Sequence, residues 1–350
     1  MAAPASEASI LPGPTTGGPG PRGPLGVVLL QMGGPVDMEA IRPFLLNLFS
    51  DNDIIQFPRF MRPWQGTLAR RIAEKRTPYI GERYKEIGGG SPIVPTTLRL
   101  AANVEKDLKA RGIDARVVTA MRYCEPTATT ALKELKAAGV REILLVTLYP
   151  HFSRSTTGSS AKDFHLARKA LGWKVPVRLI PAWGTDPGYL ALTERDIREA
   201  LAKVPKDLLP RTHLVFSPHG IPQRYADGGD PYGDQVRESY DALRARFPEV
   251  AGTHLCFQSK VGPLPWLKPY TDEYVGNLML TGVESIVTVP LGFVSDHIET
   301  LYDMDINFRT IALEGGARHY GRVRAFNDDP AFARVLSDLV QRQVSPTLRR

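Results

Sequence analysis

Cysteine is scarce in this sequence: the chain has 350 residues and only two cysteines, Cys124 and Cys256. Two cysteines cannot form a disulfide framework in a chain of this length, and they are too few for the usual ligation of an iron–sulfur cluster. They are typical of free thiols in a reducing compartment, so we expect a cytoplasmic protein.

Long apolar runs and long blocks of one charge are also missing. No stretch approaches the roughly 18 apolar residues of a membrane-spanning helix. The chain has 44 Lys and Arg against 37 Asp and Glu, but the basic residues are scattered. We therefore expect no nucleic-acid partner, although a basic face suits an anionic ligand or a membrane surface.

Familiar nucleotide-binding motifs are absent as well. The segment "QMGGP" follows an apolar run, but it lacks the third glycine of a dinucleotide fingerprint, and no phosphate-cradling loop with Gly-Lys-Ser/Thr occurs. The segment "STTGSS" at 155–160 either binds an anion or is a polar turn. Residues 1–24 are rich in Pro and Gly without the features of a signal peptide, and we predict a disordered tail there.

Six short, apolar, β-branched runs predict buried parallel strands. They occupy residues 26–34, 115–123, 141–150, 212–220, 253–260 and 284–293. Helical patterns at 97–112, 128–139, 232–247 and 271–282 lie between them. The β-α-β-α-β order thus occurs twice, which predicts an α/β protein with two similar Rossmann-like, doubly wound domains.

We place the N-terminal domain at 25–165 and the C-terminal domain at 166–327. We expect a last helix, at about 328–345, to pack back on the first domain. Ligands of such folds bind beyond the carboxyl ends of the strands, so the two domains are predicted to face each other across one cleft.

The unusual polar segments follow predicted strands. His219 lies in Ser-Pro-His-Gly-Ile-Pro, directly after one strand, and "SDHIETLYDMDI" follows another. If Ser295 caps an α-helix there, Asp296, Glu299 and Asp303 share one face. This is either a solvated acidic turn or, beside a histidine, a site for proton transfer or metal binding.

Aromatic, methionine and basic side chains are also frequent in these loops. Those that would line a wide apolar slot are Met32, Tyr84, Arg122, Tyr123, Tyr149, Phe152, Phe257 and Trp266. Arg76 and Lys260 are placed to meet carboxylates at its edge. A flat aromatic acid suits this set, although each ring is also compatible with an ordinary core.

Several long segments, in this order, resemble the ferrochelatase family. They are "LLQMGGP", "KRTPYIGERYKEIGGGSPI", "YPHFSRSTTGSS", "SPHGIPQRYADGGDPY", "FQSKVGPLPWLKPYTDE" and "GFVSDHIETLYDMDI", and the resemblance covers about residues 25–342. It implies a lyase of the chelatase fold that inserts Fe²⁺ into protoporphyrin IX in the last step of haem biosynthesis. Fe²⁺ is then a substrate, haem the product, and no tightly bound cofactor is expected.

The resemblance also implies roles for single residues. His219 matches the active-site histidine, a proton acceptor and metal-site residue, and Glu299 matches its partner carboxylate at the metal. His297 matches a further catalytic residue, while Asp296 and Asp303 match a path for protons or metal. Substrate-binding positions are matched by Met32, Arg76, Tyr84, Ser91, Arg122, Tyr149, Tyr232, Lys260 and Trp266.

The chain departs from the animal members of the family in ways that matter. Arg154 stands at the first cluster cysteine and no cysteine occurs near the C-terminus, so we expect no [2Fe–2S] cluster. Asn307 stands where a stripe of carboxylates continues in those enzymes. Met32 favours protoporphyrin IX, because relatives that use coproporphyrin III often have Tyr there.

The segment at 53–71 predicts peripheral contact with a membrane. Its apolar Phe57, Phe60, Met61 and Trp64 alternate with Arg59 and Arg62, as in a lip that rests on anionic lipid. A buried amphipathic helix is the alternative. Two other functions also remain open: a related chelatase that inserts Co²⁺ or Ni²⁺, and a porphyrin or haem carrier without catalysis.

Overall fold

The structure, a computed structural model, describes residues 23–54 and 64–344. Residues 1–22 of the predicted tail, residues 55–63 of the predicted membrane lip and the last six residues lie outside the described residues. Within the described ranges, no helix combines the length and apolar character that crossing a membrane requires.

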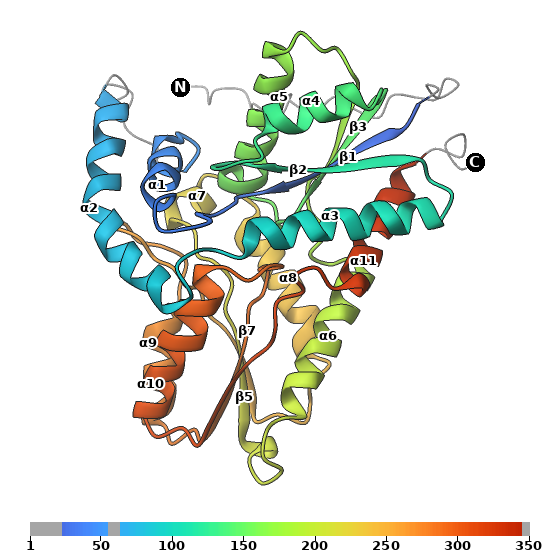
Figure 1. The fold of residues 1–350 in the computed structure, drawn as a ribbon. Helices are drawn as coiled ribbons and strands as arrows, with labels where there is room; N and C mark the ends of the chain where they lie inside the picture. Colours follow the sequence, from blue (N-terminus) through green and yellow to red (C-terminus); the bar gives the residue numbers. More distant parts are fainter. Residues whose placement is uncertain (1–22, 55–63, 345–350) are drawn as a thin grey trace, which may run out of the picture.

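Two four-stranded parallel sheets form the two halves of the molecule (Figure 1). The first contains β1 (Leu25–Gln31), β2 (Ala115–Met121), β3 (Glu142–Thr147) and β4 (Val177–Ile180) in the order β2-β1-β3-β4. The second contains β5 (Thr212–Phe216), β6 (Gly252–Leu255), β7 (Ser285–Val289) and β8 (His319–Arg322) in the order β6-β5-β7-β8. The two orders are equivalent, which confirms the predicted repeat.

The edge strands β4 and β8 are absent from the sequence prediction. Each has four residues, and three of the four side chains in each are only partly buried. A short, half-exposed edge strand lacks the continuous apolar pattern that marks a central strand. Because β4 pairs with β3, the first sheet takes a strand from the region assigned by sequence to the second domain.

Helices cover the two sheets. In the first half they are α1 (Ile41–Ser50), α2 (Gln65–Glu86), α3 (Ile93–Ala110), α4 (Ala128–Ala137), the π-turn η2 (Arg154–Gly158) and α5 (Ser159–Ala170). The second half has α6 (Pro187–Leu201), the 3₁₀ turn η3 (Leu209–Arg211), α7 (Gln223–Asp227), α8 (Tyr232–Arg244), α9 (Thr271–Leu280), the π-helix η4 (Glu299–Phe308), α10 (Arg309–Glu314) and α11 (Pro330–Gln343).

Local chemistry explains several helix starts. Thr127 caps α4 by accepting a hydrogen bond from the backbone N–H of Thr130. Asp186 and Asp329 cap α6 and α11, and each is followed by a proline at the first helical position. The capping side chains accept hydrogen bonds from free backbone N–H groups, and proline has no N–H group that needs a partner. The sequence itself therefore directs where these helices begin.

One hydrophobic core connects the two halves. It includes Leu29 and Val146 from the first sheet, Leu214 and Val287 from the second, and Leu336 from α11. As expected, α11 packs on α3 of the first half, and it also contacts α6 of the second (Figure 1). The exact domain boundary stays a prediction, because residues of both halves share this core.

Candidate active site

His219 is held by pairing between two loops that follow neighbouring strands. The backbone N–H of Gly220 donates to the carbonyl of Gln258 at 2.9 Å, and the N–H of Gln258 donates to the carbonyl of Pro218 at 3.0 Å. A β-carbon at Gly220 would lie 3.1 Å from that Gln258 carbonyl, which is tight. The hydroxyl of Tyr232 donates to the carbonyl of His219 at 2.7 Å, so the loop is fixed from a second side.

The imidazole of His219 faces a carboxylate from the other sequence motif. Nδ1 of His219 lies 3.0 Å from Oε2 of Glu299, the first residue of η4. The side-chain amide of Gln258 donates to the carbonyl of Glu299 at 3.2 Å, and it accepts from the hydroxyl of Ser217 at 2.6 Å. Sequence reasoning missed Gln258, which supports both members of the pair.

The predicted α-helix capped by Ser295 is wrong. The regular element is a π-helix that begins only at Glu299, and Ser295 makes no cap. Glu299 and Asp303 still lie near one face, because four residues are close to one turn of the wider π-helix. Such helices are rare and frequently mark functional sites.

Asp296 precedes η4 and does not join the other two acids. Its carboxylate accepts from Arg322 at 3.0 Å and from the side-chain amide of Asn327 at 2.8 Å. The hydroxyl of Thr300 donates to it at 3.0 Å. The prediction that three acids share one helical face is therefore wrong, because Asp296 precedes the helix and is bound by Arg322, Asn327 and Thr300.

The pair of His219 and Glu299 is strongly polarised. Burial alone would lower the pKa of His219, but the charge and hydrogen bond of Glu299 and the charge of Asp303 outweigh it and raise that pKa. Burial alone would raise the pKa of Glu299, yet His219 and His297 hold it well below its usual range. The ionised carboxylate of Glu299 thus stabilises the imidazolium that forms when His219 takes a proton.

Asp303 has the opposite behaviour. Burial and the charge of Glu299 raise its pKa to about 7, although Arg83 and His219 oppose the shift. A guanidinium nitrogen of Arg83 lies 3.3 Å from Oδ1 of Asp303. Two neighbouring carboxyl groups with pKa values pushed apart are typical of sites that move protons.

His297 is a close neighbour of the pair. Its Nε2 lies 3.9 Å from Oε2 of Glu299, and its Nδ1 lies 3.1 Å from the carbonyl of Ser295. Burial lowers the pKa of His297 despite the nearby carboxylates, so its ring is predominantly neutral. The ring packs against Phe293, with 4.9 Å between the two ring centres.

An apolar wall lies against the residue before Glu299. Met32, Tyr84 and Tyr123 belong to one hydrophobic cluster with Ile298. The backbone N–H of Tyr123 donates to the carbonyl of Met32 at 3.2 Å, which links the ends of β1 and β2. Burial and the charge of Glu299 raise the pKa of Tyr84, so its hydroxyl remains protonated.

Arg122 is already bound by protein carboxylates. Its guanidinium donates to Asp51 at 2.9 Å and to the hydroxyl of Ser159 at 2.8 Å, and it lies 3.6 Å from Asp163. The hydroxyl of Tyr123 donates to the same oxygen of Asp51 at 2.7 Å. Sequence reasoning missed Asp51, because nothing local in "FSDND" distinguishes a buried aspartate from an exposed one.

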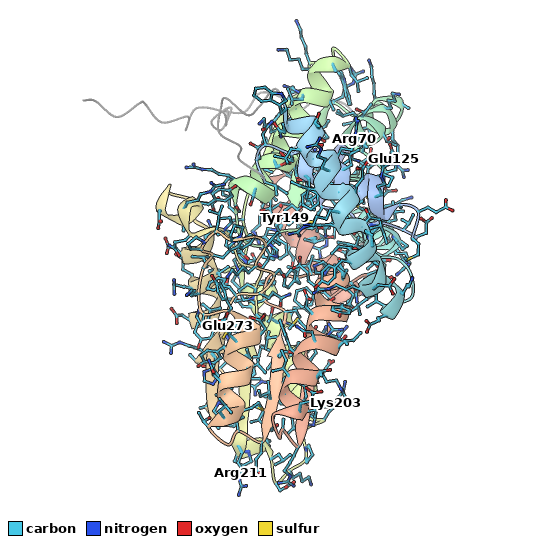
Figure 2. All side chains as sticks on the ribbon, turned by 90° about the vertical axis from the view of Figure 1, so that its left-hand side faces the viewer. Arg70, Glu125, Tyr149, Lys203, Arg211 and Glu273 are labelled. Atoms are coloured by element: carbon cyan, nitrogen blue, oxygen red, sulfur yellow. The ribbon has the colours of Figure 1, made fainter. Side chains whose placement is uncertain are left out.

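The remaining predicted substrate residues have different surroundings. The rings of Trp266 and His219 meet in a T-shaped arrangement, with 5.9 Å between ring centres. Exposed Lys260 lies over the ring of Tyr270 at 4.6 Å, and half-buried Arg76 lies 5.7 Å from the centre of Phe49. Ser91 is buried against its own turn. Tyr149 is labelled near the junction of the two halves in Figure 2 and is half-buried.

Within the described part of the chain, no three or more His, Cys, Asp or Glu side chains converge as ligands of a metal ion. His219 and Glu299 offer two. A hollow of about 380 Å³ is lined by Lys268, Pro269, Tyr270, Glu273, Tyr274 and Asn277, and none of the site residues lines it. The porphyrin cleft between the two halves therefore stays a prediction.

Comparisons with known proteins agree with the motifs. The ferrochelatase family profile matches residues 24–344. A ferrochelatase of Geotalea uraniireducens is 41% identical over 320 residues, which is 91% of this chain and 98% of that protein. One of Gloeobacter violaceus is 39% identical over 319 residues, or 90% and 96% of the two chains. The structure of SirB from Bacillus subtilis with Fe³⁺ is similar in fold, with a TM-score of 0.56, 12% identity, and 92% and 96% coverage.

Proposed function

Because this chain belongs to the ferrochelatase family, we propose that it inserts Fe²⁺ into protoporphyrin IX, with His219 as proton acceptor and Glu299 as its partner carboxylate. The products are haem and two protons, and the reaction is the last step of haem biosynthesis. The observation that carries the residue roles is the 3.0 Å contact between Nδ1 of His219 and Oε2 of Glu299.

The reaction needs a base because a free porphyrin carries two N–H protons that must leave as the metal enters. His219 has Glu299 on Nδ1, so its Nε2 is the nitrogen left to face a substrate. The negative carboxylate stabilises the imidazolium that forms when this nitrogen takes a proton. Nε2 of a neutral imidazole is also a suitable transient ligand for the entering metal.

Rigid walls are the second requirement, since a planar macrocycle hides its nitrogen lone pairs and must buckle to expose them. We propose that Met32, Tyr84, Tyr149 and Tyr232 form walls that hold the distorted ring, with Trp266 beside His219. Binding energy from the rest of the ring then offsets the strain at its centre. Met32 is the residue that favours protoporphyrin IX over coproporphyrin III.

The propionates of the substrate need partners of opposite charge or hydrogen-bond donors. We propose Arg76, Ser91 and Lys260 for this role. We also propose Arg122 for substrate binding in this region. Its guanidinium already pairs with Asp51 and Asp163, so its first role is to hold the apolar wall in place. We propose His297, a neutral ring beside Glu299, as a further catalytic residue, whereas Asp296 is held apart from Glu299 and Asp303 by Arg322, Asn327 and Thr300.

We also propose that the enzyme works in the cytoplasm at the inner face of the membrane, where an apolar porphyrin would arrive. Trp64, the last of the four apolar residues named for the predicted lip, is 63% exposed, which supports a surface that rests on lipid. Residues 55–63 of the lip lie outside the described residues. No [2Fe–2S] cluster is proposed, because Arg154 stands at the first ligand position and Cys124 and Cys256 lie in separate apolar clusters.

The decisive experiment is anaerobic insertion of Fe²⁺ into protoporphyrin IX and coproporphyrin III, followed by absorbance. We expect repeated turnover with protoporphyrin IX, and a loss of at least ~100-fold in kcat for His219→Ala and Glu299→Ala. Two matched controls should keep the wild-type rate: His165→Ala, at a half-buried position of α5, and Glu238→Ala, at an exposed position of α8.

Each other outcome has a definite meaning. A preference for coproporphyrin III would keep the chemistry and reject the role of Met32 in selectivity. Stoichiometric porphyrin binding without turnover, under conditions where a known ferrochelatase works, would indicate a carrier. Full activity of His219→Ala would reject the assignment of the proton acceptor.

A further inference from the structure

Arg83 occupies an unusual position between the two halves of the molecule. It belongs to α2, and its guanidinium lies over the ring of Tyr79 at 4.6 Å and over the ring of Tyr302, on η4, at 4.7 Å. It also donates to the carboxylate of Asp303 at 3.3 Å. Two aromatic faces and one carboxylate therefore fix the guanidinium plane.

This arrangement lies between the buried site and solvent. The side chains of Asp303 and Arg83 are 15% and 27% exposed, while Tyr79 is 60% exposed and its hydroxyl accepts from Arg83. The Nε of Arg83 is buried and has no hydrogen-bond partner among the described residues, so the guanidinium is held by Asp303, the hydroxyl of Tyr79 and the two rings. Asp303 and Arg83 thus form a pair of charged groups that leads from η4 to the surface at Tyr79.

Four charged or titratable groups act on Asp303. Glu299, on the same π-helix, and Asp272, on α9, both favour its protonated form. His219, after β5, and Arg83, on α2, both favour its ionised form. Of the two cationic groups, Arg83 is the one in direct contact with Asp303. Among these four groups, Arg83 alone comes from the first half of the molecule.

We propose that Arg83 is a positioning residue, which holds Asp303 as the carboxylate that accepts protons from the His219–Glu299 pair and releases them to solvent beside Tyr79. This inference rests on the proposed function. In each turnover the porphyrin loses two protons as Fe²⁺ takes their place. Each proton passes from a pyrrole nitrogen to His219, then to Asp303, and the last carboxylate returns to its ionised form when water takes the proton.

The physical reason is that an acceptor must be ionised to act. Burial and the charge of Glu299 would leave a proton on Asp303 through neutral pH if Arg83 were removed. A protonated Asp303 cannot take another proton, so turnover would fall at the pH values where it stays protonated. We expect substrate binding to be unaffected, because the guanidinium of Arg83 is bound to Asp303 and Tyr79 and not to the side chains proposed to hold the porphyrin.

The test compares Arg83→Gln and Arg83→Lys with the wild type in the anaerobic assay from pH 6 to 9. We expect the acid limb of kcat to move upward by about one pH unit in Arg83→Gln, hence a loss of ~10-fold at pH 6.5 and less than ~2-fold at pH 9. KM for Fe²⁺ and for porphyrin should each stay within about 2-fold. Arg83→Lys keeps the charge and should lie between the two profiles.

Two controls separate this role from general damage to the fold. Arg42→Gln removes an exposed arginine that pairs with Glu74 on the same α2, and it should keep the wild-type profile. In an Asp303→Asn background, Arg83→Gln should have no further effect, because the carboxylate it serves is gone. If Arg83→Gln fails to fold, Arg83→Lys and Asp303→Asn still decide the matter.

A uniform loss of kcat at every pH, an increase in KM for porphyrin, or full additivity with Asp303→Asn would each overturn the proposal. A decrease in KM for Fe²⁺ with an unchanged pH profile would overturn it too, because Asp303 would then serve metal entry. Absence of turnover in the wild type would instead reject the proposed function, and this proposal with it.

Discussion

At the scale of single residues, Asp51 shows how one buried carboxylate organises a wall of the site. A single oxygen, Oδ2, accepts from Arg122 and from the hydroxyls of Tyr123 and Ser159, while its other oxygen accepts from the backbone of Asp53 at 2.8 Å. The side chain is only 3% exposed. Burial would raise the pKa of Asp51, but these donors and the charge of Arg122 lower it.

We predict that Asp51→Asn lowers the free energy of unfolding by about 2–4 kcal/mol at pH 7, because it removes the buried negative charge that pairs with Arg122 and accepts from Tyr123 and Ser159. The folded pKa lies below the unfolded one, so this stability is present above about pH 3.9 and is lost as pH falls through the folded pKa. Urea unfolding at pH 7 and at about pH 2.5, which is below the unfolded pKa, measures it, with exposed Asp241→Asn as control. An equal deficit at both pH values would contradict the electrostatic account.

Backbone contacts at single glycines are the second constraint at this scale. A β-carbon at Gly90 would lie 2.2 Å from the carbonyl oxygen of Val36, and a backbone atom cannot move aside as a flexible side chain can. Gly90 precedes Ser91 in the turn between α2 and α3, so the contact holds this turn against the backbone of Val36.

We predict that Gly90→Ala lowers the free energy of unfolding by about 1–3 kcal/mol, as expected for overpacking. Gly66→Ala is the matched control, because no atom of the described residues lies within 4 Å of its β-carbon and Gly66 belongs to α2. There alanine should stabilise by about 0.5–1 kcal/mol, because it favours a helix. Thermal unfolding of both variants is the measurement, and equal shifts in one direction would contradict it.

At the scale of elements, η4 decides which acids share a site. Its sequence contains Glu299, Asp303 and Asn307, and its π geometry keeps the first two near one face. Asp303 has an unusually high pKa in the folded chain, about 7, because burial and the charge of Glu299 raise it. Ionisation of Asp303 therefore lowers the stability of the fold, as is common for residues whose position serves function.

The sign of that effect leads to a prediction about stability and pH. The folded pKa of Asp303 is above the unfolded value of about 3.9, so this group destabilises the fold increasingly as pH rises from about 4 to about 7. Between pH 5 and pH 7.5, Asp303→Asn should gain about 2 kcal/mol relative to wild type. Urea unfolding at both pH values tests this, and a constant difference between the proteins would disprove it.

At the scale of the whole molecule, the two halves share a core instead of meeting at a thin interface. Side chains from both sheets and from α11 form one cluster, and Arg83 adds a polar link between α2 and η4. A site assembled from both halves needs such a connection, because His219 and Glu299 come from one half and Met32 from the other. We therefore expect the described chain to unfold as one cooperative unit.

Leu336→Ala tests that expectation. The side chain is fully buried in α11, so its removal should lower the free energy of unfolding by about 2–5 kcal/mol. Loss of secondary structure and loss of chelatase activity should remain coincident in urea. Leu280→Ala, at an 87% exposed position, should change stability by less than about 0.5 kcal/mol. Two separated transitions would show that the halves unfold independently.

The sequence by itself determined the repeated α/β plan and the loops that carry the chemistry. Central strands such as β1 and β5 are continuous apolar runs, and this pattern is local, so it is readable without a fold. His219 and Glu299 were also identifiable, because each follows a strand and ligands bind beyond strand ends. The family resemblance extended this to the substrate.

Only the tertiary structure decided which of these groups meet. Arg83 and Asp303 are 220 positions apart in the chain, Arg122 and Asp51 are 71 apart, and no local pattern marks either pair. The same is true of Asp296, whose carboxylate pairs with Arg322 and does not join Glu299 and Asp303 as the sequence predicted. Ion pairs and buried carboxylates depend on distances across the fold, whereas hydrophobic periodicity is written along the chain.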